Sequence, residues 1–219
     1  MNEHLRAARD EAIRLRRNPT WQDLPWPDTT QAADGMPRRR WTRAEIEAMV
    51  RASIIDADER FELIGGEVVP MSPKGARHEM VKTELNEYLQ RIRADDVRVG
   101  QETTLWLDEI SFVEPDFCVW PRSILPGNQR GHDVLLAIEI ADTSLRYDLG
   151  RKVGVYAAYG IAEVWVIDAM TLVTRVHRSL GAEGYREKFD LPSESELAAI
   201  GVPSIRLSLA KLGLMPSNE

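Results

Sequence analysis

The spacing of apolar residues predicts two helices and a hairpin in the first half of the chain. Thr42 and Glu45 stand at the spacing of a capping box, so the first helix is predicted to begin there. A second helix is predicted over residues 76–93, because its apolar residues recur every three or four positions. Between these helices, residues 61–71 are strand-like on both sides of Gly65-Gly66, which predicts a hairpin with a tight turn.

Strand-like runs dominate the second half. Strands are predicted at about residues 97–107 and 111–119, with a turn between them. Residues 134–140 are almost continuously apolar, which is typical of a strand buried on both faces. A helix is predicted over residues 148–159, closed by Gly160. Two more strands, at 164–167 and 171–178, and a tail with a strand and a short helix complete the pattern.

The first 40 residues differ from the rest. Residues 1–17 mix apolar residues with arginines and predict a helix, whereas prolines recur through residues 18–40 and predict an extended arm. Trp21 and Trp26 in this arm are expected to dock on the body or on a second subunit. We therefore divide the chain into an N-terminal helix and arm, 1–40, and one domain, 41–219. The element order predicts a mixed α/β fold with a central sheet flanked by helices.

Composition places the chain among globular proteins. It has 219 residues, of which 43% are hydrophobic and 29% charged. No apolar run is long enough to cross a bilayer, and the first residues lack the apolar stretch of a secretory signal. Cys118 is the only cysteine, which excludes an intramolecular disulfide and a four-cysteine zinc site. These features predict a cytoplasmic protein without a membrane partner.

The charge does not favour tight, non-specific binding of nucleic acid. The chain has a formal net charge of −7, with 28 Lys and Arg against 35 Asp and Glu. Residues 1–40 carry eight arginines and six acidic residues, so the excess of acid lies in the domain. Nucleic-acid-binding domains usually carry a basic surface. Any contact with DNA must therefore use a local patch, a metal ion or a basic partner.

Two acidic residues stand where strands are predicted. Glu139 lies within the apolar strand at 134–140, where an unpaired carboxylate would cost several kcal/mol, so it needs a cation, a proton or an open strand end. Asp116 follows Pro115, a residue that suits the start of a strand or an edge. A Pro-Asp pair is also common in turns, and a glutamate at a strand end can simply be solvated.

Lys152 lies on the helix that follows Glu139. It is four residues after Asp148, a spacing that also occurs in ordinary surface ion pairs worth a few tenths of a kcal/mol. Tyr156 and Tyr159 continue the same side of the helix, which indicates that this side is not fully solvated. The three residues Asp116, Glu139 and Lys152 therefore form a candidate site.

From residue 61 to about residue 178, the chain resembles the PD-(D/E)XK nuclease superfamily and, within it, the restriction-endonuclease family called Uma-two. The resemblance rests on Phe61-Glu-Leu-Ile-Gly-Gly-Glu67, Met71-Ser-Pro with His78, Pro115-Asp116, Glu139-Ile-Ala-Asp-Thr-Ser144, Asp148 with Lys152, Tyr156, and Gly160-Ile-Ala-Glu-Val-Trp-Val-Ile-Asp168. It implies a restriction-endonuclease-like sheet. One position departs from the superfamily: Ala141 stands where its lysine is common, and Lys152 on the next helix takes that role in the family.

The resemblance also implies a mechanism. Asp116 and Glu139 would bind Mg²⁺ or Mn²⁺, which neutralises phosphate charge and activates a water. Lys152 would place a positive charge on the phosphate or the attacking water, although a desolvated lysine could also accept a proton. His78 would stand beside the site as a ligand to the metal or the phosphate, and an exposed helix-start histidine is the alternative. Glu62 on the hairpin is the candidate third carboxylate.

The predicted function is therefore a Mg²⁺-dependent endonuclease that hydrolyses DNA. Two alternatives stay open: a catalytically silent scaffold or interaction subunit with the same fold, and a metal-dependent hydrolase with a different substrate. The two arm tryptophans and the symmetry habits of such domains predict a homodimer.

Overall fold

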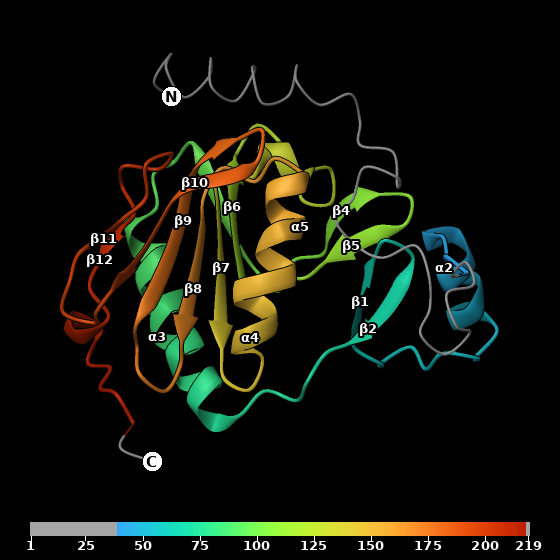
Figure 1. The fold of residues 1–219 in the computed structure, drawn as a ribbon, viewed down its shortest axis with the longest axis horizontal. Helices are drawn as coiled ribbons and strands as arrows, with labels where there is room; N and C mark the ends of the chain where they lie inside the picture. Colours follow the sequence, from blue (N-terminus) through green and yellow to red (C-terminus); the bar gives the residue numbers. More distant parts are fainter. Residues whose placement is uncertain (1–38, 218–219) are drawn as a thin grey trace.

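A six-stranded sheet forms the centre of the computed structural model, which describes residues 39–217 (Figure 1). Its strands, in spatial order, are β10 (Gly184–Leu191), β9 (Thr174–Gly181), β8 (Val164–Asp168), β7 (Leu136–Ala141), β6 (Phe117–Pro121) and β3 (Val97–Gln101). β7 and β8 run parallel, while the other neighbours are antiparallel. The predicted mixed sheet is therefore confirmed.

Helices cover both faces of this sheet (Figure 1). On one face, α3 (Ala76–Ile92) buries Val81, Leu85 and Leu89 in a cluster with the sheet and the C-terminal tail. On the other face lie α4 (Leu145–Tyr147), a π-helical turn (Asp148–Lys152) and α5 (Val153–Ala158). β7 lies between these two layers, and all six of its residues are buried, as its apolar sequence predicts.

A smaller four-stranded sheet stands beside the large one, in the order β2 (Glu67–Pro70), β1 (Phe61–Ile64), β5 (Ser111–Val113) and β4 (Leu105–Asp108). The predicted hairpin is its β1–β2 pair. At its turn Gly66 has a φ of +79°, and a Cβ there would lie 2.5 Å from the Cβ of Arg40. The turn therefore requires glycine for its backbone conformation and for space.

The first predicted helix is α2 (Arg43–Arg51), and its capping box between Thr42 and Glu45 is formed. Ile46 packs this helix against the small sheet, in a cluster with Phe61, Leu63 and Phe112. In Figure 1, α2 and the small sheet form a wing beside the three-layered body. The wing brings the hairpin, and with it Glu62, to the edge of the large sheet.

The strands predicted at 97–107 and 111–119 are wrong in one respect, because each divides into two strands that belong to different sheets. The first run breaks after β3 at Glu102, whose φ of +48° turns the chain away from the large sheet. The second breaks between β5 and β6 at Glu114-Pro115, where proline cannot donate a ladder hydrogen bond. Both breaks lie where the chain passes from one sheet to the other, and Asp116 of the candidate site directly follows the second.

The C-terminal tail forms the short elements that the sequence predicts. After β10 the tail forms the short pair β11 (Leu197–Ala198) and β12 (Arg206–Leu207), and the short helix predicted there is a 3₁₀ turn, Ala210–Leu212. The helix predicted at 1–17, most of the arm, and both Trp21 and Trp26 lie outside the described residues. Within residues 39–217, no helix has the length and apolar character needed to span a membrane.

His177 on β9 is a buried titratable residue remote from the candidate site. It is 3% exposed, packs edge-on against Tyr185, and neither ring nitrogen has a hydrogen-bond partner. Burial lowers its pKa from the ordinary 6.5 to about 4, aided by the positive charges of Lys188 and Arg175 and opposed by Asp190. The fold therefore holds His177 as a neutral ring.

We predict that this histidine makes the fold sensitive to acid. Below pH 6.5 the unfolded chain takes up a proton that the folded chain accepts only near pH 4, so the free energy of unfolding falls as pH falls through this window. The contribution is about 2–3 kcal/mol. Urea unfolding at pH 7 and pH 4.5 should show a smaller loss for His177→Phe, which keeps the ring contact, than for the wild type or the exposed-site control His132→Gln. Equal losses in all three proteins would contradict this role.

Candidate active site

Asp116 and Glu139 meet at one end of the large sheet. The antiparallel register that pairs Phe117 with Ile138 continues to place Asp116 opposite Glu139. Asp116 reaches across to β7, where its Oδ2 accepts the amide of Ile140 at 2.8 Å. Both carboxylates are buried, with 6% and 3% exposed. The two acids therefore lie next to each other, Glu139 within β7 and Asp116 directly before β6.

Lys152 reaches this end of the sheet from the π-helical turn. The turn carries the helix from α4 into α5 and buries both Asp148 and Lys152. A π turn inserts an extra residue into helical geometry and is frequent at functional sites. Asp148 accepts the Ser144 hydroxyl, and Lys152 points to the strands. The surface-pair alternative for Asp148 and Lys152 is therefore wrong.

The Lys152 ammonium joins two carboxylates from different sheets. Its Nζ lies 3.0 Å from Oε2 of Glu139 on β7 and 3.0 Å from Oε1 of Glu62 on β1. Tyr156 of α5 donates its hydroxyl to the other oxygen of Glu139. Glu62 also accepts the amide of Glu114 at 3.0 Å and the hydroxyl of Tyr147 at 3.3 Å. Glu62, the candidate third carboxylate, is thus connected to Glu139 by its ion pair with Lys152.

Asp116 is held from the opposite side by α3 and the loop before it. Nε2 of His78 lies 3.1 Å and 3.2 Å from the two oxygens of Asp116, and Nζ of Lys74 lies 2.9 Å from Oδ1. His78 is only 5% exposed, so the alternative of a surface histidine is wrong. Because α3 begins at Ala76, its first turn brings His78 directly over the carboxylate.

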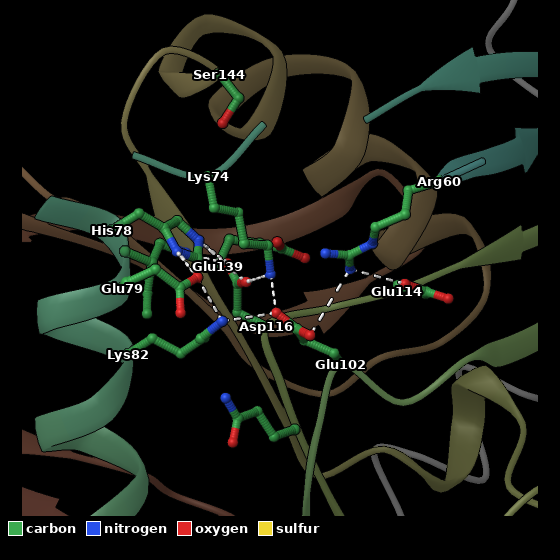
Figure 2. A network of polar contacts seen from close by, with 12 residues as sticks. Arg60, Lys74, His78, Glu79, Lys82, Glu102, Glu114, Asp116, Glu139 and Ser144 are labelled. Atoms are coloured by element: carbon green, nitrogen blue, oxygen red, sulfur yellow. Dashed lines mark hydrogen bonds and ion pairs between the residues drawn. The ribbon is translucent and has the colours of Figure 1, made fainter. Parts of the chain in front are cut away.

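A ring of alternating charges surrounds Asp116 (Figure 2). Glu102 binds the ammonium groups of both Lys74 and Lys82, with Lys82 at 2.9 Å. Lys82 also lies 2.6 Å from Glu79 of the same helix. On the far side Arg60 lies 3.2 Å from Glu114 and 3.8 Å from Glu102. The cations that lie at this site therefore already have acidic partners.

Electrostatics distinguish the acids of the site. Burial raises the pKa of Glu139 well above its usual value, and the negative charges of Asp116, Asp148 and Glu62 raise it further against the opposing effect of Lys152. Burial also acts on Asp116, but there the hydrogen bond and charge of His78, with Lys74 and the Ile140 amide, prevail and lower the pKa. Asp116 is thus the firmly ionised member of the pair.

The nearby carboxylates keep Lys152 protonated. Burial disfavours its ammonium, but Glu139, Glu62, Asp148 and Asp116 outweigh that effect and raise the pKa of Lys152 well above its usual value. The proton-accepting alternative is therefore disfavoured in this arrangement. Burial and Glu139 raise the pKa of Tyr156 as well, so its hydroxyl remains a neutral donor.

The donor set suits a hard divalent cation. Within residues 39–217, no three His, Cys, Asp or Glu side chains are grouped so that they could hold a metal by themselves. Mg²⁺, however, is usually bound through one or two carboxylates together with waters and substrate phosphates. The neighbouring carboxylates of Asp116 and Glu139 fit that pattern in chemistry and number.

The sequence prediction missed Lys74, Lys82, Glu102 and Tyr147. Lys74 had a weak signal, since it lies between Pro73 and Gly75, directly before a predicted helix and four residues before His78. Glu102 had none, because its place in the site depends on contacts with Lys74 and Lys82 from distant segments. Lys82 falls on a helix among apolar residues, where a lysine is ordinarily read as part of the solvated face.

Comparison with known proteins identifies the fold and the family of the chain. A solved structure described as a putative nuclease belonging to DUF820, from Anabaena variabilis, matches with a TM-score of 0.58 and 15% identity, over 78% of this chain and 96% of that one. This match shows a shared restriction-endonuclease-like fold. Among curated proteins, none is similar enough to count as a relative. The sequence model of the Uma2 family, described as "Putative restriction endonuclease", matches residues 44–210, and the chain therefore belongs to the Uma2 family.

Proposed function

We propose that this protein is an endonuclease that hydrolyses the phosphodiester bonds of DNA and requires Mg²⁺ or Mn²⁺. The observation that carries the proposal is the buried Lys152 ammonium, 3.0 Å from Glu139 and from Glu62, next to a second strand-end carboxylate, Asp116. Buried charged groups are costly to a fold and gather where chemistry needs them. Membership of the Uma2 family supports a nuclease in general terms.

Each residue has a role in this proposal. Asp116 and Glu139 would hold the cation, with Glu62 nearby, and the cation would supply phosphate neutralisation and a better nucleophilic water. Lys152 presents a fixed positive charge to the phosphate. His78 and the Ile140 amide orient Asp116, while Tyr156 orients Glu139.

The acidic domain is compatible with DNA as a substrate if affinity depends on the cation. Arg60, Lys74 and Lys82 gather at the site, but each binds an acidic partner, so they contribute little net charge. A divalent cation would supply the missing positive charge. The saturated state of these pairs also favours one alternative, a silent scaffold with the same fold. A cytoplasmic location and a homodimer complete the proposal, and light scattering over a range of concentrations tests the dimer.

Calorimetry followed by a cleavage assay tests the proposal. We expect Mn²⁺ to bind the wild type, and the double variant Asp116→Asn with Glu139→Gln to lose this binding while keeping its circular dichroism spectrum. Supercoiled plasmid should be nicked with Mn²⁺ and remain intact with EDTA. Glu163→Gln is the matched control, since Glu163 is buried directly before β8 and bonded to Trp165 and Ile200. Metal binding without any nicking would favour the scaffold or a different substrate.

A further inference from the structure

The Lys74 ammonium is bound to Asp116, one of the two carboxylates proposed to hold the cation. It lies in the loop between β2 and α3, and its Nζ is 2.9 Å from Oδ1 of Asp116. Its second partner is Glu102, which directly follows β3 (Figure 2). The structure thus shows Asp116 with a lysine ammonium as its counter-ion.

The donors on Asp116 differ in how readily they can leave. Oδ2 accepts the Ile140 amide at 2.8 Å, which belongs to the backbone of the buried strand β7. His78 contacts both oxygens, but it is fixed within α3 and its side chain is only 6% exposed. Lys74 sits on a loop, its side chain is 14% exposed, and its four-carbon stem is flexible. Among these three donors, Lys74 is the most exposed and the most flexible, so it can leave with the least rearrangement.

We propose that Lys74 is the resting counter-ion of Asp116 and that a divalent cation binds this carboxylate by displacing the Lys74 ammonium. The inference rests on the proposed function, because it concerns the same metal site. Two positive charges on one carboxylate oxygen repel each other, so the lysine and the cation exclude one another there. The displaced ammonium keeps its contact with Glu102. Glu102 is itself held in place by Lys82 of α3, whose Nζ lies 2.9 Å from its carboxylate. Lys74 therefore stays beside the site as a positive charge available to a phosphate.

The chain offers a matched control for this competition. Lys82 binds the same Glu102 and carries the same charge, but it binds Glu79 rather than Asp116 as its second partner. A general gain in negative charge would affect Lys74→Gln and Lys82→Gln alike. Direct competition would affect Lys74→Gln alone. Lys74→Arg keeps a cation at the position and should retain the competition.

The test is calorimetric titration of the full chain with MnCl₂, with thermal melting in EDTA to verify folding. We expect Lys74→Gln to bind Mn²⁺ roughly tenfold more tightly than the wild type, Lys82→Gln to change the affinity less than about threefold, and Lys74→Arg to match the wild type. Tight binding by Lys74→Gln where the wild type binds too weakly to measure would also support the proposal.

Three outcomes would overturn it, and they separate its failure from that of the proposed function. Equal changes in Mn²⁺ affinity for Lys74→Gln and Lys82→Gln would show that Lys74 does not compete at Asp116, and so would tighter Mn²⁺ binding by Lys74→Arg. In either case, the proposed metal site would still stand if Asp116→Asn abolishes Mn²⁺ binding. Absence of Mn²⁺ binding in every variant would remove both. If Lys74→Gln melts before it can be titrated, Lys74→Met serves as the second neutral variant.

Discussion

Glu139→Gln should reduce Mn²⁺-dependent cleavage of DNA by about 10³-fold, the order expected when one preorganised group is lost from a reacting centre. The same variant should keep most of the wild-type stability, because the buried Lys152 ammonium retains Glu62 as a partner at 3.0 Å. Its side-chain oxygen can still accept from Lys152, and its amide can donate to the Tyr156 hydroxyl, which accepts as well as donates. Activity is therefore expected to fall far more than stability.

Initial nicking rates on supercoiled plasmid and urea unfolding curves measure these two quantities. Glu163→Gln again serves as the control, since it makes the same substitution in a buried, hydrogen-bonded glutamate outside the site. It should leave the nicking rate within about threefold of the wild type, the effect of a substitution that does not touch the reacting groups. Cleavage at the wild-type rate by Glu139→Gln would locate the chemistry elsewhere.

Lys152→Met should lower the free energy of unfolding by about 3–5 kcal/mol, because it removes the cation of a buried ion pair and leaves its acidic partners without a counter-charge. These partners are Glu62 and Glu139, with 2% and 3% exposed, each 3.0 Å from the lost ammonium. Methionine fills most of the space of the lysine stem, so the loss reports on charge rather than on a cavity.

A double variant separates these causes. Lys152→Met combined with Glu139→Gln removes the ammonium together with one of its carboxylates, and it should recover a substantial part of the lost stability. Lys188→Met, at an exposed position on β10, should change the free energy of unfolding by less than about 0.5 kcal/mol. If Lys152→Met unfolds at the same urea concentration as the wild type, the ion pairs of Lys152 do not stabilise the fold.

The residues that sequence alone could predict are those with an anomalous local context. Glu139 interrupts an apolar strand, and Asp116 follows a proline before another strand, so each departs from its surroundings. The structure places both at the same sheet end and brings Lys152 between Glu139 and Glu62. The hairpin, α2, α3 and β7 were predictable for a similar reason, because their periodicity or turn chemistry is strong over a short window.

The remaining parts of the site depend on contacts between distant segments. Lys74 and Glu102 look like ordinary surface residues in sequence, and only the approach of the β2–α3 loop to the end of β3 joins them. The division of two predicted strands between two sheets likewise depends on the backbone at Glu102 and at Pro115. Similarly, the π-helical turn at Lys152 has the sequence pattern of a regular helix, so sequence alone predicts an α-helix there.

The position of Lys152 between two sheets has a consequence for the order of folding. Its carboxylate partners come from β1 of the small sheet and β7 of the large one, segments far apart along the chain. Contacts of this kind form late, since the entropy of closing long loops must be met first. An intermediate with both sheets formed but not yet docked would keep all three charges hydrated and would have no site. Closure of the Lys152 pairs should therefore coincide with the final docking step, so that competence for chemistry appears only with the native state.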